Sequence, residues 1–183
     1  NDVIENALRP AMEEAGRRFE RGEFFLAELV VAGDLFKEVM DEILVPEIQR
    51  RGSPAKALGT VVIGTVRGDL HDIGKSIVAT MLRAAGFNVI DLGVDVPPEK
   101  FVEEAVRNKA DIVAMSALLT TTMLEMKNVI EALKRAGIRD NVKVVVGGAA
   151  VTEDYARSIG ADGYGKDAVE AVRVCKRLLG IEE

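Results

Sequence analysis

The sequence predicts a doubly wound α/β domain that follows a short helical bundle. Beyond residue 54, short apolar runs alternate with stretches of helical spacing; the runs are 60–66, 87–94, 111–118, 142–148 and 161–165. The first, third and fourth runs are almost continuously apolar, as expected for parallel strands that helices cover on both faces. The intervening helices are expected near 73–85, 98–109, 122–136, 152–159 and 167–179. Together these units predict a Rossmann-like (flavodoxin-like) sheet of about five parallel strands.

The first 53 residues show apolar side chains at helical spacing only, which predicts two helices. Gly22 separates the two helices, and Pro10 is expected to perturb the first. Pro46 and the segment RRGSP at 50–54 mark a linker, so a domain boundary is expected near residue 53. We therefore expect a helical cap at 1–53 and an α/β domain at 54–183.

Composition and charge narrow the class of protein. With 48% apolar residues, a chain of 183 residues can bury a sizeable core. Its net charge of −6 opposes binding to nucleic acid or to an anionic membrane, because both need clustered Lys and Arg. Cys175, the single cysteine, lies in an amphipathic helical pattern and indicates a buried thiol in a reducing cytoplasm. No apolar run reaches about 18 residues and no signal-peptide pattern opens the chain, so neither a membrane span nor secretion is expected.

The segment GDLHDIGKS at 68–76 follows the first predicted strand and looks at first like a phosphate-binding loop. A Walker loop needs a glycine where this segment has Asp69, and Gly68 comes one residue too early. Asp69 and Asp72 would also place two carboxylates beside the anion. The pattern therefore argues against a nucleotide-binding loop.

The same segment contains His71, the only histidine of the chain, in the loop that leaves the first strand. A neutral imidazole binds a metal through one nitrogen while a carboxylate accepts the proton on the other, and Asp69 is placed to be that carboxylate. The alternative is a histidine that only caps the following helix. Zinc would need about four ligands, which this chain does not offer near His71. A metal bound here would have to bring its own equatorial ligands.

Three motifs then resemble the signature of cobalamin-binding domains: Asp69-x-His71-x-x-Gly74, Ser116-x-Leu118 and Gly147-Gly148. The 41 residues between the first two motifs and the 28 between the last two also match that family. The segment GRRFERGEFFLAEL at 16–29 resembles the helical cap of methyl-transferring corrinoid proteins. Nearly the whole chain is thus similar to the small corrinoid carrier proteins of methanogens and acetogens.

The resemblance implies a cobalamin or related corrinoid bound base-off/His-on, with its nucleotide base displaced into a tunnel of the α/β domain. It implies His71 as the lower axial ligand of cobalt, with Thr122 extending a hydrogen-bond relay through Asp69. Ser116 would bond the displaced base or ribose, and Gly147 and Gly148 would keep the tunnel open. The implied cofactor-binding residues are Gly68, Asp69, Leu70, His71, Asp72, Gly74, Ser116, Leu118, Thr120, Thr122, Gly147, Gly148, Ala168, Phe19 and Leu26.

Several of these residues have an ordinary structural alternative. Gly147 and Gly148 could form a strand-end turn, and the threonines could cap helices. Phe19 and Leu26, which in the family lie over the upper face of the corrin, could be plain bundle core. The chain also departs from the family pattern, with Ala27 in place of a common proline and Ser76 in place of a common asparagine.

The family's cap has four helices and only two are found here, so an N-terminal truncation is expected. A two-helix cap exposes an apolar stripe that missing residues, a partner or a second copy would cover.

The implied function is that of a methyl carrier that is not itself the catalyst. One methyltransferase would load the cobalt from a substrate, a second would pass the methyl group to tetrahydrofolate or a thiol coenzyme, and a reductive activase would restore the cofactor. A cobalamin-dependent sensor is the alternative, but it normally carries a DNA-binding segment or a bulky aromatic cap, and this chain has no Trp and no basic helix. The cobalamin domain of a mutase would need a substrate barrel that this sequence lacks.

Overall fold

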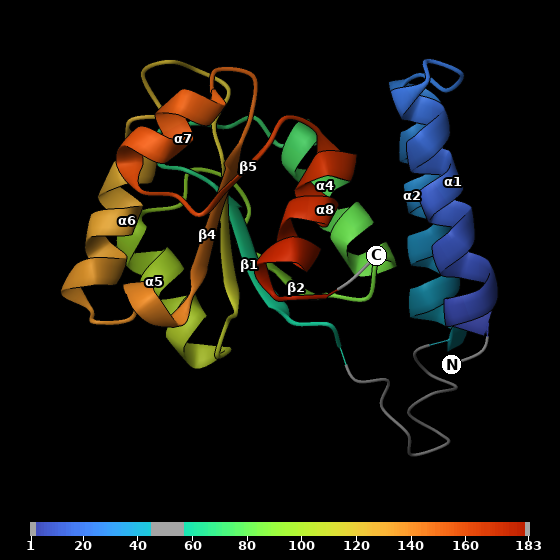
Figure 1. Ribbon diagram of the computed structural model, residues 1–183, viewed down its shortest axis with the longest axis horizontal. Coiled ribbons are helices and arrows are strands. Elements are labelled where there is room, and N and C mark those ends of the chain that lie inside the picture. Colours follow the sequence, from blue (N-terminus) through green and yellow to red (C-terminus); the bar gives the residue numbers. More distant parts are fainter. Residues whose placement is uncertain (1–2, 45–56, 182–183) are drawn as a thin grey trace.

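The computed structural model, which describes residues 3–44 and 57–181, contains a five-stranded parallel sheet of order β2-β1-β3-β4-β5 (Figure 1). This is the predicted doubly wound fold, in which strand order reverses between β1 and β3. The strands are β1 (Thr60–Thr65), β2 (Asn88–Asp91), β3 (Ile112–Ser116), β4 (Lys143–Gly147) and β5 (Gly163–Gly165). The helices that follow them are α4 (Ile73–Ala84), α5 (Pro98–Arg107), α6 (Glu125–Arg135), α7 (Glu153–Ile159) and α8 (Ala168–Leu178), with a short 3-10 turn at Arg139–Asn141 before β4.

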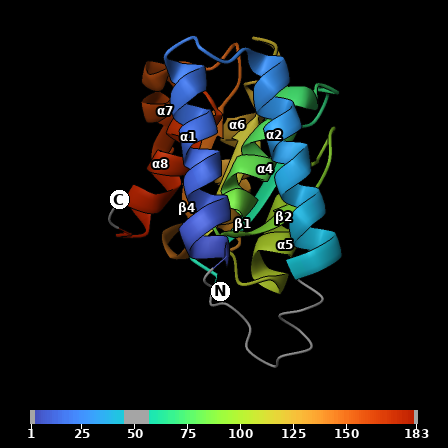
Figure 2. The same cartoon turned by 90° about the vertical axis from the view of Figure 1, so that its right-hand side faces the viewer.

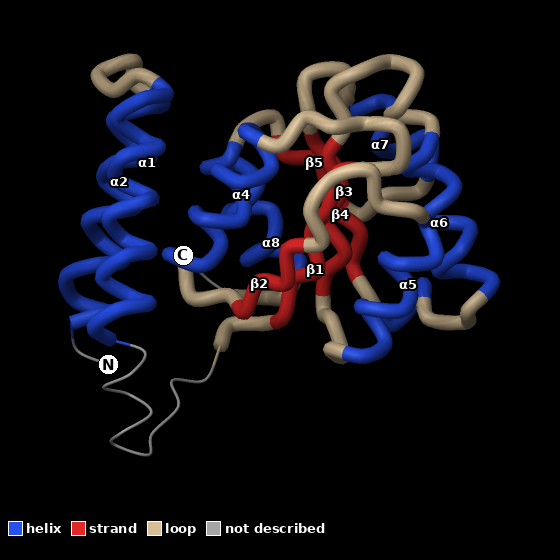
Figure 3. Tube along the Cα trace, turned by 180° about the vertical axis from the view of Figure 1, so that it is seen from behind, coloured by secondary structure: helices blue, strands red, loops and turns tan. Residues whose placement is uncertain are grey.

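Alternation along the strands divides the core into two layers. Val62, Val113 and Val144 lie in one fully buried cluster with residues of α5, α6 and α7, whereas Val61, Ile112 and Val145 lie in the other with residues of α4 and α8. Both faces of the sheet are therefore covered, which explains the nearly continuous apolar runs in the sequence. Figure 3 shows these two helical layers on either side of the strands.

The register places the carboxyl ends of the central strands at one edge. Thr65 of β1 pairs with Ser116 of β3, and Ser116 pairs with Gly147 of β4. This register brings the three predicted motifs together at one place in the fold. Ligands of open parallel sheets bind at such an edge, beyond the carboxyl ends of the strands.

The N-terminal part forms a two-helix cap, α1 (Arg9–Glu20) and α2 (Leu26–Val39), with π-helical turns at Ile4–Leu8 and Met40–Leu44. Pro10 lies in the first turn of α1, and the chain directly before this helix is π-helical rather than α-helical. The link between the two helices contains Gly22, whose φ of +71° explains the glycine there.

The cap lies side by side with α4 and α8 (Figure 2). Met12, Leu29 and Phe36 are buried in a cluster with Met81 and Val169 of the α/β domain. Gly33 of α2 lies close against α4, since a Cβ atom there would lie 2.8 Å from Cγ2 of Thr80. The cap is therefore docked through apolar and small residues.

The predicted elements coincide with the observed ones except at their ends. The helix expected from residue 122 begins at Glu125, because Thr122 lies in a turn and its hydroxyl bonds elsewhere. The strands expected at 87–94 and 111–118 are shorter, at Asn88–Asp91 and Ile112–Ser116. The predicted linker and the boundary near residue 53 lie outside the described residues. Within the described ranges, no helix is long and apolar enough to cross a membrane.

Candidate functional site

The loop after β1 carries His71 to the carboxyl edge of the sheet. A turn at Gly68, with φ +78°, lets the N–H of Asp69 donate to the carbonyl of Val66 at 3.2 Å. The hydroxyl of Thr65, at the end of β1, donates to the carbonyl of His71 at 2.9 Å. The loop is thus tied to the strand at both ends, and the His71 side chain remains 52% exposed.

Asp69 connects His71 to the loop after β3. One carboxylate oxygen lies 2.6 Å from Nδ1 of His71 and accepts from the His71 backbone N–H at 3.1 Å. The other oxygen accepts from the hydroxyl of Thr122 at 2.6 Å and from the N–H of Leu118 at 2.8 Å. The structure therefore brings the three predicted relay residues, His71, Asp69 and Thr122, into one hydrogen-bonded chain.

The electrostatics of this chain determine which nitrogen of His71 is free. Burial by itself raises the pKa of the Asp69 carboxyl, which is only 1% exposed, but the hydrogen bonds from Thr122, Leu118 and His71 outweigh it and hold the pKa far below its usual range. An ionised Asp69 is an acceptor only, so Nδ1 of His71 carries the proton. The lone pair of Nε2 is then available to a metal.

His71 does not cap the helix that follows it. The N-cap residue of α4 is Asp72, whose side chain makes no capping hydrogen bond and instead accepts from Ser76 at 2.9 Å and pairs with Lys75 at 2.8 Å. The geometry thus favours the ligand interpretation of His71 over the capping one.

Several apolar residues near His71 are exposed. Leu70 and Ile73 are 71% and 72% exposed, and Leu118, which bonds Asp69 through its N–H, is 40% exposed together with Leu119 at 45%. Exposed apolar residues of this kind, here next to exposed polar residues such as Asp72 and Thr120, are typical of a binding site for a largely apolar ligand.

A cavity of about 360 Å³ runs from His71 between the strand ends, α4 and α8. It brings together several of the residues predicted for the site: Phe19, His71, Gly74, Ser116, Leu118, Gly147, Gly148 and Ala168. Asp69 and Thr122 lie behind His71 rather than in the wall. Thr120 is exposed, and the side chain of Leu26 lies outside the described part of the molecule.

The glycines of the site have different structural causes. Gly148 has φ +118°, and a Cβ atom there would overlap the carbonyl oxygen of Ala117; a Cβ at Gly147 would lie 2.7 Å from the carbonyl oxygen of Gly165. Both are required by the close approach of protein backbone. At Gly74, in contrast, a Cβ would meet no atom within 4 Å, although this glycine lies in α4 and lines the cavity. A cavity-lining helical glycine with no steric partner in the protein fits the passage of a bound ligand.

Most of the remaining cavity wall was not predicted from the sequence, and Leu29 and Lys75 are two examples. Leu29 of α2 is buried there, and its spacing three residues after Leu26 could have indicated it. Lys75 is buried with 1% of its side chain exposed, and its Nζ donates to both oxygens of Asp91 at 2.5 and 2.6 Å. Asp91 ends β2, beside β1 in the sheet, so the pair depends on strand order, which the sequence alone does not specify.

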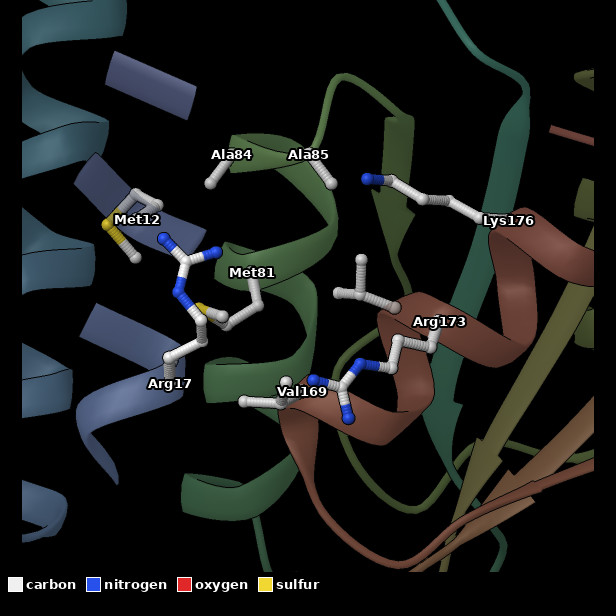
Figure 4. Close-up of a pocket in the computed structure, with 10 residues that line it drawn as sticks. Met12, Arg17, Met81, Ala84, Ala85, Val169, Arg173 and Lys176 are labelled. Atoms are coloured by element: carbon white, nitrogen blue, oxygen red, sulfur yellow. The ribbon is translucent and has the colours of Figure 1, made fainter. Parts of the chain in front are cut away.

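A second cavity, of about 330 Å³, lies between the cap and the α/β domain (Figure 4). Met12, Met81 and Val169 form its apolar wall, and Arg17 and Arg173 project toward it. It shares no lining residue with the cavity at His71. The contact between cap and domain is therefore incompletely filled at this point.

Comparison with known proteins decides the family. A B12 binding domain model matches residues 59–173, and a second B12 binding domain model matches residues 1–44. The chain belongs to the B12-binding corrinoid proteins. It is thereby a corrinoid-binding protein, as the three sequence motifs predicted.

The most similar relatives of this corrinoid protein include the trimethylamine corrinoid protein 1 of Methanosarcina acetivorans, 49% identical over 97% of this chain and 82% of that protein. The dimethylamine corrinoid protein of Methanosarcina barkeri is 48% identical over 98% of this chain and 83% of that protein.

Two solved structures share the fold over the whole chain. A cobalamin-binding protein from Desulfitobacterium hafniense has a TM-score of 0.80 at 36% identity and covers 97% of this chain and 82% of its own. A chain of the methanol:cobalamin methyltransferase complex MtaBC from Methanosarcina barkeri has a TM-score of 0.84 at 34% identity, covering 98% of this chain and 67% of its own.

Proposed function

We propose that this corrinoid protein binds its cofactor base-off/His-on, with His71 as the lower axial ligand of cobalt, and carries a methyl group derived from a methylamine. The observation that carries the proposal is the hydrogen-bonded chain of Thr122, Asp69 and His71, which leaves Nε2 of an exposed imidazole free. The names of the relatives, trimethylamine and dimethylamine corrinoid proteins, support the choice of methyl source.

The bound corrinoid supplies the cobalt that accepts and releases the methyl group; the protein supplies position and electrostatics. Asp69 holds the proton on Nδ1 of His71 and orients the ring, while Thr122 and the N–H of Leu118 keep that carboxylate ionised. If His71 were released from a bound cobalt, its Nε2 could take up a proton while Asp69 continues to accept from Nδ1.

The surface and the cavity accommodate the two parts of the cofactor. The exposed residues Leu70, Leu118 and Leu119 would contact the flat macrocycle beside His71. The cavity wall then takes the displaced nucleotide tail, with Gly74 at the passage and Ser116 as a hydroxyl for the base or ribose. Gly68 and Asp72 shape the loop, and Thr120 faces the cofactor from the exposed loop after β3.

The cap shields the site. Phe19 and Leu29 line the cavity that begins at His71, so the cap helices exclude water from that region. Docking of a partner would displace the cap, which packs on α4 and α8 through an apolar cluster. We place the junction between cap and domain near residue 53, between the two matched ranges 1–44 and 59–173.

The proposed partner proteins are inferred from the resemblance to known corrinoid proteins. The resemblance to a chain of a methanol:cobalamin methyltransferase complex supports a stable contact with a substrate-specific methyltransferase. The second methyltransferase, acting on tetrahydrofolate or a thiol coenzyme, and a reductive activase complete the proposed system.

The test is methylation of the reconstituted protein. The protein is loaded with cobalamin, reduced, and mixed with the methyltransferase of the same operon and trimethylamine, dimethylamine or methanol, while the visible spectrum is recorded. A spectral change with an amine and none with methanol is expected, and omission of the amine serves as the control. A change with methanol alone would contradict the methylamine assignment, and failure to bind cobalamin would contradict the whole proposal.

A further inference from the structure

The loop that joins β2 to α5, residues 92–97, lies against the outer side of the His71 loop. Within it, Asp95 has φ +54°, a left-handed conformation that non-glycine residues rarely adopt, although Asp tolerates it better than most. Asp95 is exposed, so no packing in the core enforces this conformation. The cause must lie in the contacts that Asp95 makes.

Both polar groups of Asp95 bond the turn that precedes His71. Its carboxylate accepts from the N–H of Gly68 at 2.7 Å, and its own backbone N–H donates to the carbonyl of Asp69 at 3.0 Å. The left-handed backbone is what aims the side chain and the N–H at the same turn. Asp95 therefore holds Gly68 and Asp69 from outside, whereas Thr122 and Leu118 hold Asp69 from inside.

The rest of the loop is fastened to the same region. The N–H of Val96 donates to the carbonyl of Thr65 and the N–H of Thr65 to the carbonyl of Gly93, each at 3.0 Å. At the start of the loop, Asp91 accepts from the N–H of Gly93 at 2.9 Å and from buried Lys75 of α4. The β2–α5 loop therefore contacts the start of the His71 loop through Asp95. Just before it, Asp91 at the end of β2 contacts Lys75 of α4, the helix that follows the His71 loop.

We propose that Asp95 is a positioning residue for the axial ligand: by clamping the Gly68–Asp69 turn, it sets the height and direction at which His71 meets cobalt. This inference rests on the proposed His-on binding. Without the clamp, the turn gains freedom that must be lost again when the cofactor binds, so both the affinity and the axial bond weaken.

Three substitutions separate the contributions of Asp95. Asp95→Asn keeps an acceptor oxygen and tolerates the left-handed backbone; Asp95→Gly keeps only the backbone freedom; Asp95→Ala keeps neither. Glu103→Ala, which removes another exposed carboxylate on α5, is the control. The dissociation constant for aquocobalamin and the splitting by an axial nitrogen in the electron paramagnetic resonance spectrum of the Co(II) form are measured, together with thermal unfolding of the cofactor-free proteins.

Asp95→Ala is expected to weaken cobalamin binding by about tenfold and to lower the fraction of cobalt with an axial nitrogen. Asp95→Gly should weaken cobalamin binding by about threefold, and Asp95→Asn by less than about twofold. The clamp is overturned if Asp95→Ala and Asp95→Gly keep the wild-type affinity and nitrogen signal, even if thermal unfolding shifts, or if Asp95→Asn loses as much as Asp95→Ala. A wild-type protein without an axial nitrogen would instead overturn His-on binding, and the clamp with it.

Discussion

The loop that carries His71 and the cap that lies beside it are held by different forces. Asp69 accepts hydrogen bonds from Thr122, Leu118 and His71 within 3.1 Å, so the ring has one favourable position. The cap contacts α4 and α8 through apolar side chains such as Leu29 and Phe36. Hydrogen bonds depend steeply on geometry, whereas apolar burial does not. The difference suits a site that must fix a ligand and yet uncover it.

The largest effect is expected from Asp69→Ala. The substitution leaves the buried hydroxyl of Thr122 and the N–H of Leu118 without their acceptor and frees Nδ1 of His71. We expect a loss of about 4 kcal/mol in the free energy of unfolding, measured in urea on the cofactor-free protein, and loss of axial ligation. Thr122→Ser, which keeps the hydroxyl, is the matched control and should stay close to the wild type.

The same carboxylate predicts a pH dependence. The pKa of Asp69 is lowered in the folded state, so its stabilising contribution is complete above the unfolded value of about 4 and declines as the pH falls below it. Asp69→Asn should lack this part of the acid dependence of unfolding. Equal acid dependence of the two proteins would show that Asp69 is not held ionised in the fold.

Two glycines of the site, Gly148 and Gly74, separate a role in protein stability from a role in cofactor binding. Gly148→Ala places a Cβ atom on the carbonyl of Ala117 at φ +118° and should cost about 3 kcal/mol in the free energy of unfolding. Gly74→Ala meets no protein atom within 4 Å and should leave the cofactor-free protein unchanged or slightly more stable, by up to about 1 kcal/mol. It should nevertheless weaken cobalamin binding; unchanged binding would contradict the passage of the cofactor tail at Gly74.

The smallest effect on axial ligation is expected from a substitution in the cap. Leu29→Ala removes a side chain that is 2% exposed and should cost about 2 kcal/mol, with faster amide exchange over α1 and α2. The axial nitrogen signal should stay as in the wild type. Leu35→Ala, on the same helix but 59% exposed, is the control. Loss of the axial nitrogen in Leu29→Ala would show that cap and ligand loop are coupled rather than independent.

The sequence was most informative where local chemistry decides the structure. Continuous apolar runs predicted the covered parallel sheet, and Asp69-x-His71 predicted a carboxylate beside an imidazole. Gly147 and Gly148 were predicted for the cofactor, and the structure adds a second cause, the close backbone approach of Gly165 and Ala117.

Contacts that depend on strand order were beyond the sequence. Lys75 is buried against Asp91, because β2 lies beside β1 in the sheet. The left-handed backbone of Asp95 likewise has no signal in the residue pattern, since Asp is common in ordinary turns. Such residues are recognised only once the loops of neighbouring strands are seen together.

The central claim, that His71 binds cobalt through Nε2, is tested most directly by electron paramagnetic resonance of the Co(II) cobalamin form. The wild-type protein should show splitting by one axial nitrogen, His71→Gly should lose it, and added imidazole should restore it. An unchanged nitrogen signal in His71→Gly would contradict the claim.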